Sequence, residues 1–352
     1  MRILKEHFCL YPAMRPTDVI KCLYQRTFGG EHIAPDFAHV REYLAREYET
    51  VAQTADFPHI EPLGGGIVRL YLNGIPRESI DTVARLFVRG AKIRSVNADA
   101  MEASLAEVRA AALRGETPFS PEDWDAAVAA WRAGGCTSVH HSAEYRAAYK
   151  PAYRVIPSAY VPYLPLLFAI DARMAAGERT VLAIDGMCGS GKSTLADLLS
   201  DLYGASVVRM DDFFLPPDLR TPNRLCEAGG NIHYERFCEE VSPSLGTGVP
   251  FSYRAFDCSR MALGGTVEVP AHALTVVEGS YALHPALHAR YDLTAYVSCT
   301  AEEQAVRLRS RCAHEALYAR FVNEWIPMET AYARAFSARE RADFGIDTTN
   351  SE

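Results

Sequence analysis

The chain has 352 residues, of which 49% are hydrophobic and 23% charged, and its formal net charge is −8. A chain of this length can bury the cores of two domains, and its acidic balance, without a lysine or arginine block, argues against a nucleic-acid scaffold. Nine scattered cysteines without a C-x-x-C pair are typical of reduced thiols in a cytoplasmic protein and argue against a disulfide frame or zinc site.

Neither the N-terminus nor the longest apolar run carries a targeting signal. The opening MRILKEHFCLYP lacks the apolar centre of a secretion signal. The run YVPYLPLLFAI is too short and too rich in proline to span a bilayer. We therefore expect a cytoplasmic protein that binds neither a membrane nor a nucleic acid, and whether it forms a homo-oligomer is left open.

Residues 1–150 are predicted to form a mostly helical domain. One helix begins near Pro16 and stops at Gly29-Gly30, and another has Ser120 as its N-cap. GIVRLYLN at 66–73 is one candidate strand. The sequence suggests acceptor recognition or regulation as the role of this domain.

Polar residues of this region leave a second catalytic site open. Glu31, His32 and His140 are candidates if the fold brings them together, although a helix end followed by a turn explains the first two equally well. His140 and His141 should point to different sides of a helix and form no metal pair by themselves. Gly64-Gly65-Gly66 precedes a strand, and so lacks the context of a phosphate loop.

Residues 151–175 are predicted to be a stiff connector rich in proline and tyrosine, followed by a helix that starts near residue 166. From 176 to 352 the chain alternates between short apolar runs and helical stretches, the pattern of a doubly wound α/β domain. The predicted strands are TVLAID, ASVVRM, LTVVEG and LTAYVS. The predicted helices lie near 192–203, 232–241, 301–312 and 316–341, and the last of them is expected to be long and amphipathic.

The stretch GMCGSGKS matches the phosphate-binding loop pattern G-x-x-x-x-G-K-[ST], also called Walker A, and lies between a strand and a helix as that pattern requires. Glycines let several backbone N–H groups approach one phosphate chain, and the helix adds its positive N-terminal end. We expect Lys192 to reach the β- and γ-phosphates and Ser193 to hold Mg²⁺. The predicted nucleotide-binding residues are Gly186, Cys188, Gly189, Ser190, Gly191, Lys192, Ser193 and Thr194.

Two carboxylates follow the second predicted strand, in VVRMDDFFLPPD. The carboxyl ends of parallel strands are where open α/β sheets bind ligands. An aspartate at this point can accept a hydroxyl proton, lie in the Mg²⁺ shell, or both. No guanine-binding N-K-x-D motif follows the loop, which argues against a GTPase.

An ordered set of motifs between about 175 and 345 resembles the uridine kinase-like P-loop kinases, a group that includes phosphoribulokinase and pantothenate kinase relatives. The motifs are GMCGSGKST, RMDDFFLP, GNIHYERF, YRAFDC, VVEGSYALHP and RLRSRC. GNIHYERF and YRAFDC depart from the stretches that contact the nucleoside in uridine kinases. The resemblance therefore implies the chemistry of the family without naming the acceptor.

The resemblance implies ATP and Mg²⁺ as cofactors and assigns roles to single residues. Asp211 is the expected general base, and Lys192, Arg309 and Arg311 complete the catalytic set. Arginine forks of a lid helix, which also holds Arg307, would neutralise charge on the transferred phosphoryl group. The expected metal ligands are Ser193, Asp211 and Glu278. The expected acceptor contacts are Asp211, Phe213, Tyr253 and Asp257.

We therefore expect a kinase that transfers the γ-phosphate of ATP to a hydroxyl group of a small molecule. Two alternatives remain open at this stage. One is a bifunctional enzyme with separate chemistry in residues 1–150, and the other is a nucleotide-sensing regulatory protein.

Overall fold

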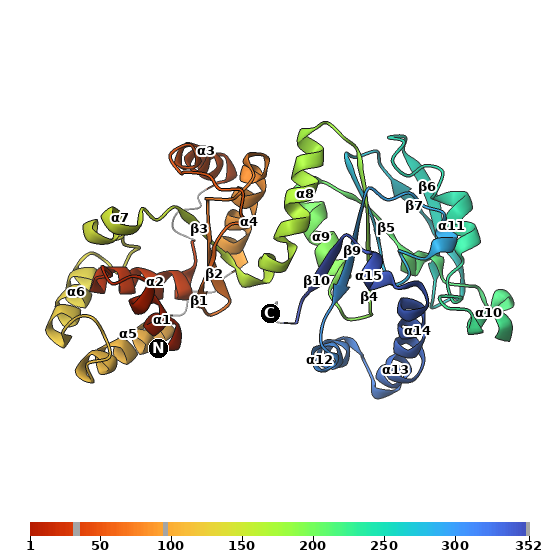
Figure 1. Cartoon of the computed structure of the whole chain (residues 1–352). Coiled ribbons are helices and arrows are strands. Elements are labelled where there is room, and N and C mark those ends of the chain that lie inside the picture. The colour runs from red at the N-terminus through yellow and green to blue at the C-terminus, as the bar shows by residue number, and fades with distance from the viewer. Residues whose placement is uncertain (31–35, 94–97, 350–352) are drawn as a thin grey trace. The chain divides into compact units, whose positions relative to one another are not determined.

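A computed structural model of the chain describes residues 1–30, 36–93 and 98–349. The chain divides into two compact units, and the boundary between them lies between Val161 and Pro162 (Figure 1). Glu31 and His32, two members of the hypothetical second catalytic site, lie outside the described residues.

Unit 1, which ends at Val161, combines α-helices with a small sheet (Figure 1). Its helices are α1 (Arg2–Leu10), α2 (Pro16–Phe28), α3 (Phe37–Tyr48), α4 (Ile80–Ile93), α5 (Ala98–Leu113), α6 (Pro121–Ala133) and α7 (Ala143–Tyr149). The α6 helix begins as its sequence predicts, because the side chains of Ser120 and Asp123 each bond the other's backbone N–H.

Three antiparallel strands form the sheet of unit 1, in the order β1-β2-β3. They are β1 (Ile60–Gly64), β2 (Ile67–Tyr71) and β3 (Tyr153–Pro157). The sequence predicted only the middle strand, and β3 falls in the segment assigned to a connector. Its pairing with β2 joins positions more than 80 residues apart, which no local pattern can indicate.

The three consecutive glycines of unit 1 form the turn between β1 and β2. Gly64, Gly65 and Gly66 have φ values of 83°, 61° and 71°. Residues with a Cβ rarely adopt this left-handed region. The triple glycine therefore serves a tight hairpin, in agreement with its lack of phosphate-loop context.

A network of polar side chains, all buried except the half-buried Tyr153, lies inside unit 1, and we call it the buried polar cluster. Its members are Asp18, Gln25, Glu61, Arg69, His141 and Tyr153. Arg69 is fully buried and donates to Glu61 at 3.2 Å and to Gln25 at 2.9 Å. His141 contacts Asp18 through Nδ1 at 2.8 Å and Tyr153 through Nε2 at 2.7 Å. His141 precedes α7 and lies in no helix, contrary to the prediction for the His140-His141 pair.

This cluster predicts that unit 1 loses stability in mild acid. Burial lowers the pKa of His141 from 6.5 to about 4, so the unfolded chain binds a proton there before the folded chain does. Hydrogen bonds from His141 and Ser142 also lower the pKa of Asp18, although burial alone would raise it. Stability is therefore lost as the pH falls, and the His141 contribution between pH 7 and pH 5 is about 2 kcal/mol.

This loss is measured by urea unfolding, with tryptophan fluorescence as the probe. The background variant is Trp325→Phe, in which only Trp124 and Trp131 of unit 1 report. His141→Gln should flatten the dependence on pH, whereas His140→Gln, a change at the exposed neighbour, should leave it unchanged. Equal slopes in the two variants would show that His141 does not carry the effect.

Unit 2 is a mixed α/β unit built on a five-stranded sheet in the order β10-β9-β4-β8-β5, and all its neighbouring strands run parallel. The strands are β4 (Thr180–Gly186), β5 (Ser206–Arg209), β8 (Leu274–Glu278), β9 (Leu293–Ser298) and β10 (Phe344–Asp347). Four of them lie where the apolar runs predicted strands. The short β10, with only Ile346 buried, was not predicted.

Helices lie on both faces of this sheet (Figure 1). On one face are α8 (Leu164–Ala175) and α9 (Lys192–Tyr203). On the other face α11 (Tyr234–Glu240), α14 (Ile326–Phe336) and α15 (Ala338–Arg341) pack with strand residues such as Ala183 and Tyr296 in one apolar core. The fold is thus wound on two sides, as the sequence predicts.

The remaining elements follow or connect these strands. They are α10 (Pro222–Cys226), the hairpin of β6 (Phe251–Asp257) and β7 (Ala262–Val269), α12 (Ala301–Arg311) and α13 (Glu315–Arg320). The expected helix at 316–341 is divided, because Phe321–Trp325 forms a π-helical turn between α13 and α14 and Ser337 adopts a left-handed conformation before α15.

Candidate functional site

The loop between β4 and α9 has the backbone that its glycines predict. Gly186, Gly189 and Gly191 have φ values of 145°, 73° and 99°, a region that L side chains rarely adopt. A Cβ on Gly186 would also collide with the backbone oxygen of Val297 on β9. The first N–H groups of α9, which begins at Lys192, have no acceptor within their own helix. Loop and helix end together form a suitable cradle for an anion.

Lys192 lies across this loop, not in solvent. Its side chain is buried, and Nζ donates to the backbone oxygens of Gly186 at 2.9 Å and Met187 at 3.0 Å and to Ser280 Oγ at 3.3 Å. An ammonium group held by the loop carbonyls is already beside the place where the loop would receive phosphate. The structure therefore puts the predicted lysine at the predicted loop.

Ser193 and Glu278 meet at the carboxyl ends of neighbouring strands. Ser193 Oγ donates to Glu278 Oε1 at 3.0 Å, and the same oxygen accepts from Arg209 at 3.0 Å. Glu278 Oε2 is buried without a hydrogen-bond partner among the described residues. Burial raises the pKa of Glu278. The charges of Lys192 and Arg209 oppose this rise, and the charge of Asp211 adds to it.

This pair fits a Mg²⁺ ion as part of its ligand set. A hydroxyl and a carboxylate oxygen without a partner are hard ligands, and Mg²⁺ at phosphate sites normally takes one or two such side chains together with phosphates and water. In residues 1–30, 36–93 and 98–349, no group of three or more His, Cys, Asp or Glu side chains could hold a metal by itself. A metal at this site would therefore depend on phosphate and water for its other ligands.

Asp211 and Asp212 lie in the 3-10 turn Met210–Phe213 that follows β5. The Asp211 side chain is exposed, and it lies two residues after Arg209, which pairs with Glu278 at 3.0 Å. Asp212 is half-buried and accepts a hydrogen bond from the Tyr253 hydroxyl at 2.8 Å. Burial raises the pKa of Asp212, and the Tyr253 hydrogen bond opposes this rise. Of the two carboxylates, Asp211 is the one open to solvent.

Three expected acceptor contacts have partners inside the protein, and their contact with an acceptor stays a prediction. Phe213 is fully buried against Phe237 and Tyr253, so its ring packs in the core. Tyr253 is 3% exposed, and its hydroxyl is bonded to Asp212. Asp257 caps the turn after β6 by accepting from Ser259 N, Ser259 Oγ and Arg260 N, and the Ser259 hydrogen bonds lower its pKa. The alternating apolar pattern of this segment reflects packing of the β6-β7 hairpin.

The three arginines of α12 have different surroundings. Arg307 donates to Thr348 Oγ1 at 2.9 Å and Thr348 O at 2.8 Å and pairs with Glu303. The exposed Arg309 lies over the Tyr318 ring at 4.9 Å from its centroid, and Arg311 is exposed at the end of the helix. Arg307 also donates to the Gly189 carbonyl at 3.5 Å and so supports the phosphate loop. Arg309 and Arg311 point outward, and their expected catalytic role stays a prediction.

Cys188 acts through its backbone. Its N–H donates to Glu329 Oε2 at 2.8 Å, and its carbonyl accepts from Gln304 Nε2 at 2.7 Å. Burial and the charge of Glu329 raise the pKa of the thiol, so it is an inert side chain at this position.

Two carboxylates at this site were not predicted. Asp185, the residue before the loop, is buried and accepts from Tyr332 Oη at 2.6 Å and from three backbone N–H groups, those of Gly186, Tyr281 and Leu283. Glu329 of α14 accepts from Ser280 Oγ at 2.8 Å and from Cys188 N. Asp185 lies at the end of an apolar strand, and this position was the sequence signal that could have identified it. Glu329 lies in a helix whose sequence gives no sign of its contacts with Ser280 and Cys188.

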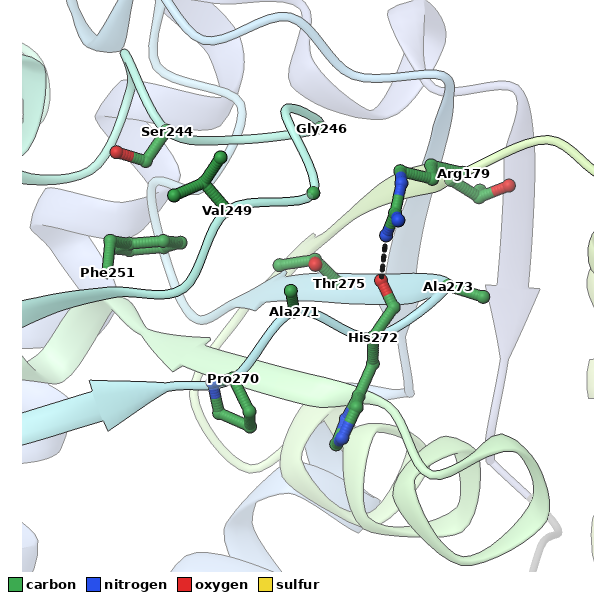
Figure 2. A pocket seen from close by; sticks show the side chains of 12 residues that line it. Arg179, Ser244, Gly246, Val249, Phe251, Pro270, Ala271, His272, Ala273 and Thr275 are labelled. Atoms are coloured by element: carbon green, nitrogen blue, oxygen red, sulfur yellow. Dashed lines mark hydrogen bonds between the residues drawn. The ribbon is translucent and has the colours of Figure 1, made fainter.

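A small hollow lies at the other end of the sheet (Figure 2). Arg179 and Thr180, where β4 begins, line it together with His272 and Thr275, and Arg179 donates to the His272 carbonyl at 3.4 Å. Its volume of about 10 Å³ holds no more than about one water molecule. It faces away from the loop that follows Gly186 and takes no part in that site.

Comparison with known proteins gives limited guidance. No protein-family model matches the chain, and no curated protein does. A solved structure of a possible uridine kinase from Bacillus stearothermophilus superposes with a TM-score of 0.39 at 20% identity, covering 52% of this chain and 100% of that chain. A proposed fructose transport system kinase from Silicibacter sp. TM1040 superposes with a TM-score of 0.39 at 26% identity, covering 48% of this chain and 89% of that chain. Neither resemblance identifies the reaction or the acceptor of this chain.

Among the described residues, no helix is both long enough and apolar enough to cross a membrane.

Proposed function

We propose that unit 2 is a Mg²⁺- and ATP-dependent kinase that transfers the γ-phosphate to a hydroxyl group of a small molecule. The observation that carries this proposal is the meeting of three groups at the carboxyl ends of β4, β5 and β8. These groups are the glycine loop with its buried Lys192, the Ser193–Glu278 pair, and the exposed Asp211. A phosphate cradle, a metal ligand pair and a carboxylate open to solvent are the parts that phosphoryl transfer needs.

In the proposed reaction, the Asp211 carboxylate accepts the proton of the acceptor hydroxyl while the hydroxyl oxygen attacks the γ-phosphorus. The bond from the γ-phosphorus to the bridging oxygen breaks, and ADP leaves with the electron pair. Lys192 supplies positive charge where negative charge develops on the phosphate oxygens. Ser193 and Glu278 would hold Mg²⁺, which when bound neutralises charge on the β- and γ-phosphates.

The test is detection of product. The full-length protein is incubated with Mg²⁺, ATP and a broad panel of hydroxyl metabolites, and phosphorylated products are identified by mass spectrometry. We expect transfer to at least one acceptor, and we expect this transfer to disappear in Asp211→Asn. ATP binding without transfer to any hydroxyl compound would instead favour the nucleotide-sensing alternative.

Glu329 provides a second test, of nucleotide binding. Its carboxylate bonds the loop N–H of Cys188, and a fixed negative charge at this point repels a polyphosphate. Glu329→Gln should therefore bind Mg·ADP about fivefold to tenfold more tightly than the natural chain, as measured by calorimetry.

The matched control is Glu324→Gln, because Glu324 lies in the preceding turn and pairs with Arg320 on the surface. Its affinity for Mg·ADP should not change. Weaker binding by Glu329→Gln would mean that this carboxylate helps to hold the nucleotide.

A further inference from the structure

Unit 1 contains a cavity of about 600 Å³, which is within the size range of small-molecule sites. It is lined by residues of α2, α3 and β3 and of the segment before α7. All of its lining residues in the described part of the chain belong to unit 1, and none belongs to the phosphate loop of unit 2. No step of the proposed reaction uses it.

The described lining of this cavity is basic, although the whole chain is acidic. Lys21, Arg146 and Arg154 line it, and Glu47 is the one carboxylate among the described lining residues. With histidines neutral, these side chains leave a formal excess of two positive charges. A local excess of this kind in a chain with a net charge of −8 favours an anionic ligand.

Arg154 has donor capacity that the protein does not use. Its side chain is 8% exposed, Nη1 pairs with Glu47 at 2.6 Å and donates to the Tyr153 carbonyl at 2.8 Å. Its Nη2 is buried without a hydrogen-bond partner among the described residues. A buried guanidinium N–H group without a partner is costly, and a shift of the Arg154 side chain that brings Nη2 to a ligand oxygen in the cavity would remove that cost.

Lys21 offers a second cationic group on the opposing element. Its Nζ donates to the Val139 carbonyl at 2.8 Å, one of the three hydrogen bonds that an ammonium group can donate. Burial lowers the pKa of Lys21 to about 8, which shows that its charge lies in a poorly solvated place. A bound anion would stabilise that charge.

The remaining wall is fixed by the buried polar cluster. The Asp18 carboxylate faces His141 Nδ1, so Nε2 of the neutral ring is left to accept from the Tyr153 hydroxyl at 2.7 Å. The guanidinium of Arg69 lies over the Tyr153 ring at 4.6 Å from its centroid. These contacts hold Tyr153 and His141 in place, so the cavity has a preformed aromatic and polar wall.

We propose that this cavity binds a small phosphorylated metabolite, with Arg154, Lys21 and Arg146 contacting its phosphate group. A phosphate monoester carries a charge of about −1.5 to −2 at neutral pH, which matches the positive excess of the lining, whereas a single carboxylate leaves part of it unbalanced. Arginine forks and lysine ammonium groups are the usual protein partners of phosphate. The aromatic faces of Tyr43 and Tyr153 would contact the organic part of the ligand.

The experiment uses the full chain carrying Lys192→Met, so that phosphate binding at the loop of unit 2 is weakened and the outcome does not depend on kinase activity. The probes are inorganic phosphate, glycerol 3-phosphate and ribose 5-phosphate, with glycerol, ribose and acetate as counterparts. Calorimetry gives the affinity. The labelling rate of Lys21 by an amine-reactive reagent, read by mass spectrometry, gives the location.

We expect at least one phosphate probe to bind with a millimolar or lower Kd and to slow the labelling of Lys21, while its dephosphorylated counterpart does neither. Arg146→Gln should weaken this binding about tenfold or more. Arg146 is exposed on α7, so the change should leave the fold intact. Arg132→Gln, at a surface arginine of α6 that pairs with Glu102 of α5, should have no effect.

The proposal is overturned if no phosphate probe protects Lys21, if binding survives both Arg146→Gln and Lys21→Met, or if acetate binds as well as the phosphates. Lys21→Met and Arg146→Gln are compared at matched far-UV circular dichroism. A loss of binding in either variant can then be separated from misfolding.

Discussion

Asp211→Asn is expected to lower kcat by about 10²–10⁴-fold, because an amide cannot accept the proton of the acceptor hydroxyl. The structure leaves this side chain exposed in the turn that follows β5, whose last residue, Arg209, pairs with Glu278. Since the residue lies outside the glycine loop, the affinity for Mg·ATP should change little. The measurements are steady-state kinetics with the identified acceptor and calorimetry with a non-hydrolysable ATP analogue.

Asp212→Asn is the matched control for this prediction. Asp212 is adjacent in sequence but is half-buried and bonded to Tyr253, so its replacement should affect stability more than the proton transfer. If Asp212→Asn abolished transfer and Asp211→Asn did not, the roles of the two carboxylates would be the reverse of those proposed here.

Lys192→Met is expected to lower kcat by about 10²–10³-fold, the cost of removing one group that stabilises developing charge. It should also weaken nucleotide binding, because it removes the only ammonium group of the loop. In addition, it removes one donor from each of the carbonyls of Gly186 and Met187, which then accept from Ser280 Oγ and Ser190 N, respectively. The loop itself should therefore be less ordered in the variant.

The sequence provides a direct way to observe Lys192. It is the only lysine between residues 162 and 350, so amine labelling of unit 2 reports on this residue alone. Mg·ATP should protect Lys192 from labelling in the natural chain and in Asp211→Asn. Lack of protection by saturating nucleotide would contradict the assignment of this loop as the phosphate site.

The parts of unit 2 that the sequence predicted are those with strong local signals. Buried parallel strands such as β4 and β8 have continuous apolar runs, and the Gly186–Ser193 pattern has a fixed spacing. Glu329 was not identified because it reaches Cys188, 141 positions earlier in the chain, from a helix that otherwise looks like core packing. Asp185 was passed over because it ends a strand as an ordinary polar residue would.

The acceptor contacts stay predictions for a related reason. Phe213 and Tyr253 were associated with the acceptor because of their positions in motifs, yet their rings pack against each other at 5.0 Å between centroids. A motif gives the order of residues along the chain but not the direction in which a side chain points. In unit 1 the pairing of β2 with β3 depended on the whole fold and was beyond any local pattern.

The contact between Thr348 and the phosphate loop sets the order in which this site can be completed. The Thr348 hydroxyl donates to the Ser190 carbonyl at 2.7 Å across 158 positions, and Arg307 holds the same threonine. During synthesis the loop leaves the ribosome long before Thr348 and β10, the edge strand of the sheet, have been made. A nascent chain can therefore form the β4–α9 turn early, but it acquires the complete, braced loop only when its last strand joins the sheet.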